Sequence, residues 1–272
     1  MANDDPSYIK AYEDIEFLKS DELRPVRLLL ELTKAEILQR NAGIRSTLVV
    51  FGSARLVAPS VARERLEGAR REASLRPGDA ATELALKVAE RAVENSKYYD
   101  MAREFGRIVS ATCQTDGLCD FVIVTGGGPG TMEAANRGAH DAGAKTIGLN
   151  IVLPREQDPN PFITYGLCFN FHYFAIRKMH FMLRAKALVA FPGGFGTLDE
   201  LFEALTLVQT GKVQHLPVVL VGRKFWEKTI NFNHLVDEGL IAPQDLRLFR
   251  FADSAEEAWR HVSDYYAAFG DE

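Results

Sequence analysis

The sequence predicts a doubly wound α/β fold with a mostly parallel sheet. Two observations predict it. From Thr47 onward, short apolar runs of strand length alternate with longer amphipathic stretches, and two of the runs end in glycine-rich turns. Strands that alternate with helices over short connections are typical of parallel βαβ units, whose crossovers are right-handed. A helical N-terminal arm and a helical insertion are expected in addition to this sheet.

The strand candidates are apolar on both faces. Several are rich in Val, Ile and Phe and lack a polar alternate face, as expected when helices cover both sides of a parallel sheet. They comprise residues 47–51, 121–125, 146–151, 167–171, 187–191, 217–221 and 246–251.

Helical patterns follow or separate these strands. The third of them places Leu198, Leu201, Leu205 and Val208 at helical spacing. The predicted helices comprise residues 131–142, 173–186, 197–210, 225–238 and 254–269.

Two segments lie outside the alternation. Residues 14–43 predict one or two charged amphipathic helices, with Pro25 near the first turn of the longer one and an apolar stripe formed by Leu28, Leu29, Leu32 and Ile37. Residues 58–117 predict a helical insertion between the first two strands. Its charge-rich part alternates Glu with Arg, which favours a solvated helix face over a binding patch, and a helical pattern over 82–112 follows. We therefore expect an arm over residues 1–45 and one domain over residues 46–272.

The composition excludes several classes of protein. The chain has 272 residues, of which 47% are apolar and 25% charged, and a net charge of −5; collagen-like, wholly disordered and disulfide-scaffold proteins differ from this. The acidic balance argues against binding to nucleic acid or to a membrane surface. The three cysteines form no CxxC pair, and the acidic start resembles no secretory signal. A cytoplasmic location is therefore predicted.

The two glycine-rich turns share one design. One strand leads into Gly126-Gly127-Gly128-Pro129-Gly130-Thr131, another leads into Pro192-Gly193-Gly194-Phe195-Gly196-Thr197, and a helix follows each. Glycines permit a close backbone approach, and Thr stands where the helix should begin. The free N–H groups of a helix start bind phosphate or carboxylate, and such turns lie at the edge of the sheet where ligands bind.

Neither turn has the sequence of a common nucleotide-binding loop. No GK[ST] follows the last glycine, and neither turn matches GxGxxG strictly, which disfavours ATPases and dinucleotide enzymes. A Rossmann-like pocket for a mononucleotide or a sugar phosphate remains.

Polar side chains near the turns indicate the chemistry. Glu200 and Glu133 stand early in the two helices; Thr197 and Glu200 have the spacing of a capping box, so a structural role for these carboxylates is an open alternative. Against it, Arg177 and Lys178 lie in an otherwise mostly apolar and aromatic helical segment. A carboxylate, an arginine and a phosphate cradle in one cleft suit hydrolysis at a phosphorylated sugar.

The sequence resembles the LOG (LONELY GUY) family. The segments GGGPGTMEAANRGA (126–139) and PGGFGTLDE (192–200), with the Arg-Lys pair between them, carry the resemblance, which covers roughly residues 47–221. These phosphoribohydrolases release the base from cytokinin riboside 5′-monophosphates and often from AMP. Many relatives carry a lysine decarboxylase label, yet the motifs indicate no lysine for pyridoxal phosphate.

The resemblance implies roles for individual residues. Arg177 and Glu200 would be catalytic, assisted by Lys178. The nucleotide and its phosphate would be bound by residues of the two glycine-rich turns and of the short turn after the first strand, namely Gly52, Ser53, Gly126, Gly127, Gly128, Gly130, Thr131, Gly193, Gly194, Gly196 and Thr197. The chain departs from short plant-like members in having Phe174-Ala175-Ile176 before Arg177, and Thr131-Met132-Glu133 in place of GLMG. These departures concern the identity of the base more than the reaction.

The expected reaction is hydrolysis of the N-glycosidic bond of a purine nucleoside 5′-monophosphate, without a metal or an organic cofactor. A non-hydrolytic nucleotide or cofactor carrier, similar to molybdenum-cofactor carriers, is the alternative, and a partner-binding module built on the arm is a third. The resemblance implies a homodimer or a higher homo-oligomer. Structural roles are favoured for His180, Tyr173 and Phe181, and Cys168 is expected to be a buried small apolar residue.

Overall fold

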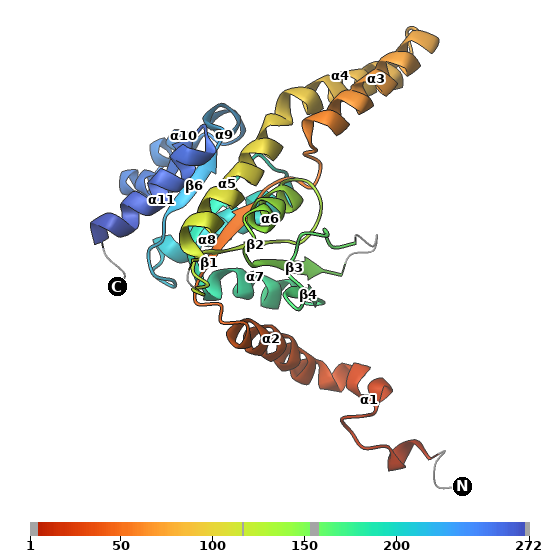
Figure 1. The fold of residues 1–272 in the computed structure, drawn as a ribbon, viewed down its shortest axis with the longest axis vertical. Coiled ribbons are helices and arrows are strands. Elements are labelled where there is room, and N and C mark those ends of the chain that lie inside the picture. The colour runs from red at the N-terminus through yellow and green to blue at the C-terminus, as the bar shows by residue number, and fades with distance from the viewer. Residues whose placement is uncertain (1–4, 116, 153–157, 270–272) are drawn as a thin grey trace.

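The computed structural model describes residues 5–115, 117–152 and 158–269, so the outermost residues of the predicted arm and domain lie outside it. A seven-stranded sheet in the order β4-β3-β2-β1-β5-β6-β7 forms the centre of the molecule (Figure 1). Every neighbouring pair of strands is parallel. The strands are β1 (Thr47–Phe51), β2 (Val122–Thr125), β3 (Thr146–Ile151), β4 (Cys168–Phe171), β5 (Ala185–Ala190), β6 (Val218–Val221) and β7 (Phe249–Ala252).

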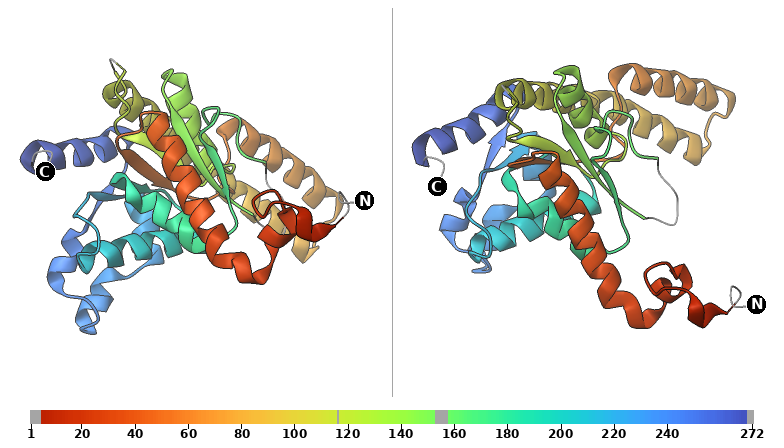
Figure 2. Two further views of the ribbon diagram at one scale, coloured as in Figure 1. Left: turned by 90° about the horizontal axis from the view of Figure 1, so that it is seen from below. Right: turned by 60° about the horizontal axis from the view of Figure 1, so that its bottom comes forward.

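Helices cover both faces of the sheet (Figure 2). On one face α5 (Lys97–Cys113), α6 (Thr131–Asp141) and α11 (Ala255–Phe269) enclose Leu48, Ile123 and Val219. On the other, α7 (Phe174–Leu183), α8 (Phe195–Gln209), α9 (Arg223–Thr229) and α10 (Phe232–Asp237) enclose Val49 and Leu188. The predicted doubly wound α/β fold is confirmed.

The strand order creates a switch point beside β1. The chain builds outward from β1 to β4 at one edge and then returns to place β5 on the other side of β1. Ligands of open α/β sheets bind outside the carboxyl ends of the strands at such a point. The fold therefore puts the turns after β1 and β5 next to each other at the position that favours binding.

Three predicted boundaries were wrong. Residues 225–238 form two helices, because Asn231 accepts a hydrogen bond from the backbone of His234 (3.1 Å) and starts α10 anew. The seventh strand begins only at Phe249, since Pro243–Arg247 form a 3₁₀ helix. The helix predicted over residues 173–186 ends earlier, because α7 stops at Leu183 and β5 already begins at Ala185.

The helical stretch between β1 and β2 has two parts. Helices α3 (Pro59–Leu75) and α4 (Ala80–Asn95) pack on each other and project away from the sheet (Figure 1). The pattern predicted over 82–112 is interrupted at Ser96, after which α5 packs on the sheet through Tyr98, Phe105 and Val109. Helix α5 therefore serves as the crossover helix between β1 and β2, and only α3 and α4 form an insertion.

The N-terminal helices are α1 (Ile15–Lys19) and α2 (Arg24–Asn41), and Pro25 lies in the first turn of α2 as predicted. The predicted apolar stripe is split: Leu28 and Leu32 are half-buried, whereas Leu29 and Ile37 are exposed, because residues 28, 32, 35 and 39 share one helix face. The division into an arm and one domain stays a prediction.

Helix α2 holds the start of α7. Glu31 accepts hydrogen bonds from the backbone N–H groups of His172 (2.8 Å) and Tyr173 (3.2 Å), and Arg184 pairs with Glu36. A carboxylate at these N–H groups stabilises a helix start. Within the residues described, no helix is long and apolar enough to cross a membrane.

Candidate active site

The turns after β1, β2 and β5 are tied to one another by backbone hydrogen bonds. Ser53 donates its N–H to the carbonyl of Pro192 (3.2 Å), and its own carbonyl accepts from the N–H of Thr131 (3.1 Å). The two glycine-rich turns thus meet across the short turn that follows β1. A shared cleft requires this arrangement.

Several of the predicted binding glycines are packed closely against the backbone or a side chain of a neighbouring segment. Gly130 has φ +75°, and a Cβ there would lie 2.4 Å from the carbonyl oxygen of Ser53. Gly127, also at φ +75°, leaves room for the amide of Asn150, and Gly52 leaves room for the side chain of Thr131. Gly127, Gly128, Gly130 and Thr131 are buried. The absence of a Cβ at these glycines lets the turns pack closely against their neighbours.

The start of α8 is open to solvent instead. The helix begins at Phe195 after Gly194, with no side-chain cap, and a Cβ at Gly194 or Gly196 would meet nothing within 4 Å. The N–H groups of the first helical residues have no intrahelical acceptor. Phe195 is 93% exposed. Of the two helix starts that follow glycine-rich turns, this is therefore the one that an anion could reach.

The capping-box alternative for Glu200 was wrong. Thr197 is the third residue of α8, is buried, and lies where a Cβ on Gly193 would be only 2.1 Å from its hydroxyl oxygen. Glu200 is a full turn further inside the helix. A structural reason for this carboxylate at the helix start is thus removed.

Arg177 and Glu200 form a buried ion pair. The Nη1 of Arg177 lies 3.1 Å from Oε1 of Glu200, and the two side chains are 10% and 14% exposed. The Nε of Arg177 donates to the carbonyl of Leu149 at the end of β3 (2.7 Å), and its guanidinium lies over the ring of Phe181. Gly126 makes room for the other amino group, since a Cβ there would lie 2.7 Å from it. Residues from α7, α8, β3 and the turn after β2 therefore converge here.

Burial sets the protonation of the pair. It raises the pKa of Glu200 to about 7, while the charges of Arg177 and, to a lesser degree, Lys178 act in the opposite direction. Burial also lowers the pKa of Arg177, opposed by the Glu200 charge, and an arginine still stays protonated. Glu200 thus titrates near neutrality, which is the range that favours a general acid or base.

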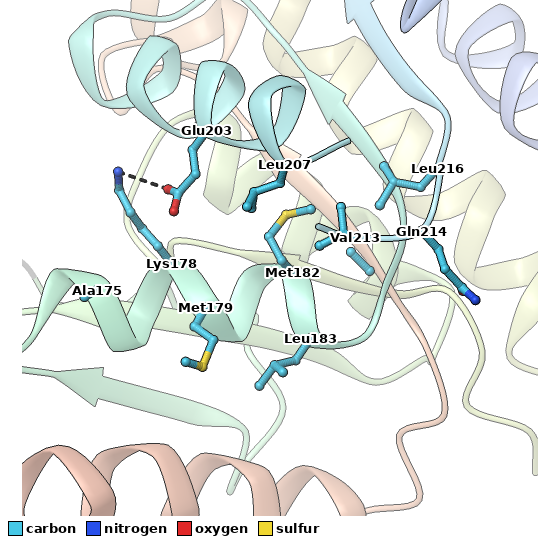
Figure 3. Close-up of a pocket in the computed structure, with 11 residues that line it drawn as sticks. Ala175, Lys178, Met179, Met182, Leu183, Glu203, Leu207, Val213, Gln214 and Leu216 are labelled. Atoms are coloured by element: carbon cyan, nitrogen blue, oxygen red, sulfur yellow. Dashed lines mark ion pairs between the residues drawn. The ribbon is translucent and has the colours of Figure 1, made fainter. Parts of the chain in front are cut away.

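Lys178 turns away from its neighbour in the sequence. Its Nζ lies 2.7 Å from Asp199 and 3.0 Å from Glu203, because adjacent helix residues point about 100° apart. It lies at one end of a cavity of about 470 Å³ between α7 and α8, which Met182 and Leu207 also line (Figure 3). The structure does not bring Lys178 into contact with Glu200.

A buried network that sequence analysis missed supports the turn after β2. The amide of Asn160 donates to the carbonyls of Gly127 and Gly128 (3.1 Å each) and to the side-chain oxygen of Asn136 (2.9 Å). Asn160 belongs to the irregular segment before β4, and no motif in the sequence points to it.

The residues expected to have only structural roles differ in their surroundings. His180 and Phe181 are buried; the His180 ring contacts the carbonyl of Leu32 (3.1 Å), so their structural roles are confirmed. Tyr173 is held through its hydroxyl by Arg27 (3.4 Å). The prediction for Cys168 was wrong, because it lies on the exposed face of the edge strand β4. In the part of the chain that the structure describes, no group of three His, Cys, Asp or Glu side chains could hold a metal ion.

Comparisons with known proteins show the family to which the chain belongs. A family model described as possible lysine decarboxylase matches residues 132–262, which include Arg177 and Glu200. The chain is 30% identical over 152 residues to the cytokinin riboside 5′-monophosphate phosphoribohydrolase LOG7 of Arabidopsis thaliana, covering 54% of this chain and 68% of that protein. The chain belongs to the LOG family.

Further similarities extend the comparison. LOG3 of Arabidopsis thaliana, which is also named a cytokinin riboside 5′-monophosphate phosphoribohydrolase, is 28% identical over 177 residues, covering 63% of this chain and 77% of that protein. A solved structure of a molybdenum-cofactor carrier protein from Chlamydomonas reinhardtii is 26% identical, with a TM-score of 0.44, and covers 63% of this chain and 89% of that one. The curated LOG relatives are thus named as hydrolases.

Proposed function

We propose that this LOG-family protein hydrolyses the N-glycosidic bond of a purine nucleoside 5′-monophosphate, AMP or a cytokinin-type nucleotide, to the free base and ribose 5-phosphate. The observation that carries the proposal is the buried Arg177–Glu200 pair beside the interlocked turns at the carboxyl edge of the sheet. The phosphoribohydrolase activity for which the relatives LOG7 and LOG3 are named supports it.

The first step is to hold the phosphate. The open N-terminus of α8, with Gly194 and Gly196 unobstructed, offers N–H groups and the positive end of the helix dipole to the 5′-phosphate. Binding energy from the phosphate, which does not react, positions the sugar for reaction. Ser53 and Gly193 lie next to this phosphate site. The buried glycines contribute to it only by allowing the close packing of the turns.

The bond is then broken at C1′. The pair of electrons of the C1′–N bond leaves with the base, the ribose develops oxocarbenium character, and a water oxygen bonds to C1′. The Glu200 carboxylate stabilises the positive charge and takes a proton from the water; that proton then passes to the departing base, which leaves Glu200 ionised again. Arg177 keeps Glu200 ionised and oriented. Lys178 acts on Glu200 only through its charge.

The activity is tested by incubating the full chain with AMP and separating the products by chromatography. We expect adenine and ribose 5-phosphate in equal amounts, and much slower release of adenine from adenosine, because adenosine lacks the phosphate. A rise in melting temperature with AMP but no release of adenine would instead indicate a binding or carrier protein.

The pH dependence gives a separate prediction. Because the pKa of Glu200 is raised to about 7 and its carboxylate is the reactive form, kcat/KM should rise with pH up to about 7 and level off above it; kcat/KM reports on the free enzyme. The measurement is a pH series with AMP and with a substrate analogue whose phosphate group does not titrate in this range. An increase in kcat/KM toward acid pH would assign Glu200 as a general acid.

A further inference from the structure

A second cavity opens at the switch point, on the side of the turns that faces helix α4. It has a volume of about 410 Å³, and Ser53, Pro192 and Gly193 form one wall. These residues belong to the two turns that flank β1 and β5. The opposite wall comes from α4, a helix between β1 and β2 that projects beyond the sheet (Figure 1).

The charged side chains that line this cavity are all cationic. Arg55 follows the turn after β1, while Lys87 and Arg91 stand four residues apart on one face of α4, and no carboxylate lines the cavity. Arg91 is paired with Glu94 in the same helix. Neither Arg55 nor Lys87 has a carboxylate partner within the described ranges.

Apolar side chains also line the cavity. Leu56 is buried, Phe225 is half-buried and Val88 is exposed, so the cavity is open to water. Two unpaired cations beside the backbone turns, with no carboxylate in the lining, attract an anion rather than an uncharged group.

We propose that Arg55 and Lys87 bind the phosphate group of the substrate, so that α4 completes the nucleotide site from outside the sheet. The proposal rests on the proposed function for the identity of the substrate but not for the existence of the anion site. Helices α3 and α4 contain none of the motifs that carry the sequence resemblance, and neither cation was among the predicted site residues. The two side chains would distinguish the nucleotide from its unphosphorylated nucleoside.

The test compares Arg55→Ala, Lys87→Ala and the double variant with the unchanged chain. Calorimetric titrations use inorganic phosphate and ribose 5-phosphate as probes. A hydrogen bond to a charged group contributes roughly 1.5–3 kcal/mol, so each single variant should weaken binding of ribose 5-phosphate by about 10- to 100-fold. With AMP, KM should rise by a similar factor while kcat changes less than about threefold, because the cations lie away from the bond that is broken.

The matched control is Arg71→Ala, which removes an exposed cation of α3 outside the cavity and should change neither titration. Unaltered binding of both probes by the double variant, or the absence of binding by the unchanged chain, would overturn the proposal. A failure of the proposed function looks different: the chain would release no adenine from AMP, yet binding of ribose 5-phosphate would still depend on Arg55 and Lys87.

Discussion

Replacing Glu200 by Gln should lower kcat for AMP by about 10²- to 10⁴-fold, the range of a general base in other enzymes. The amide has the same shape but carries no negative charge, so it neither takes a proton from water nor stabilises the developing charge on ribose. Because the proposed phosphate site lies elsewhere, at the start of α8, the affinity for AMP should change by less than about tenfold. Chromatographic assays give kcat, and calorimetry with AMP gives the affinity.

The control is Glu133→Gln. Glu133 stands early in the helix after the other glycine-rich turn and accepts a hydrogen bond from Tyr99 (2.7 Å), which a glutamine oxygen also accepts. This variant should retain turnover within a few-fold. If Glu200→Gln were as active as Glu133→Gln, Glu200 would not take part in the reaction.

Replacing Arg177 by Met should have the second-largest effect, a loss of about 10²- to 10³-fold in kcat/KM at pH 7, comparable to removal of a transition-state donor. Methionine retains bulk but leaves Glu200 buried without its cation. The pKa of Glu200, already raised to about 7 with Arg177 present, would then increase further, so that the carboxyl is protonated at pH 7.

The pH profile separates this effect from misfolding. With Arg177→Met, the pH above which kcat/KM levels off should move to higher pH, and part of the lost activity should return in alkaline buffer. The Arg177→Lys variant keeps the positive charge but loses the hydrogen bond either to Leu149 or to Glu200. Its kcat/KM should lie between the values of the unchanged chain and of Arg177→Met. A loss of activity that is the same at every pH would show that Arg177 acts on the substrate and not through Glu200.

Much of the fold could be predicted because its causes are local. Strands buried on both faces must be apolar throughout, so runs such as Thr47–Phe51 and Val122–Thr125 are visible without a structure. The interruption at Asn231 was missed, because helical spacing continues through the residue while a side-chain cap restarts the helix. The exposure of Cys168 was missed because an edge strand has only one covered face.

The sequence by itself determined that glycine-rich turns follow two strands of one parallel sheet and that Arg177 and Glu200 accompany them. Only the tertiary structure decided where each of these residues lies and what it contacts. Gly130 packs on Ser53 while Gly194 stays open, Lys178 separates from Arg177, and α4 brings Lys87 to the cavity beside the turns. The physical reason is that backbone approach, burial and pKa depend on neighbours from distant parts of the chain. The pKa of Glu200 is raised only when α7 and α8 pack together and bury the carboxyl group.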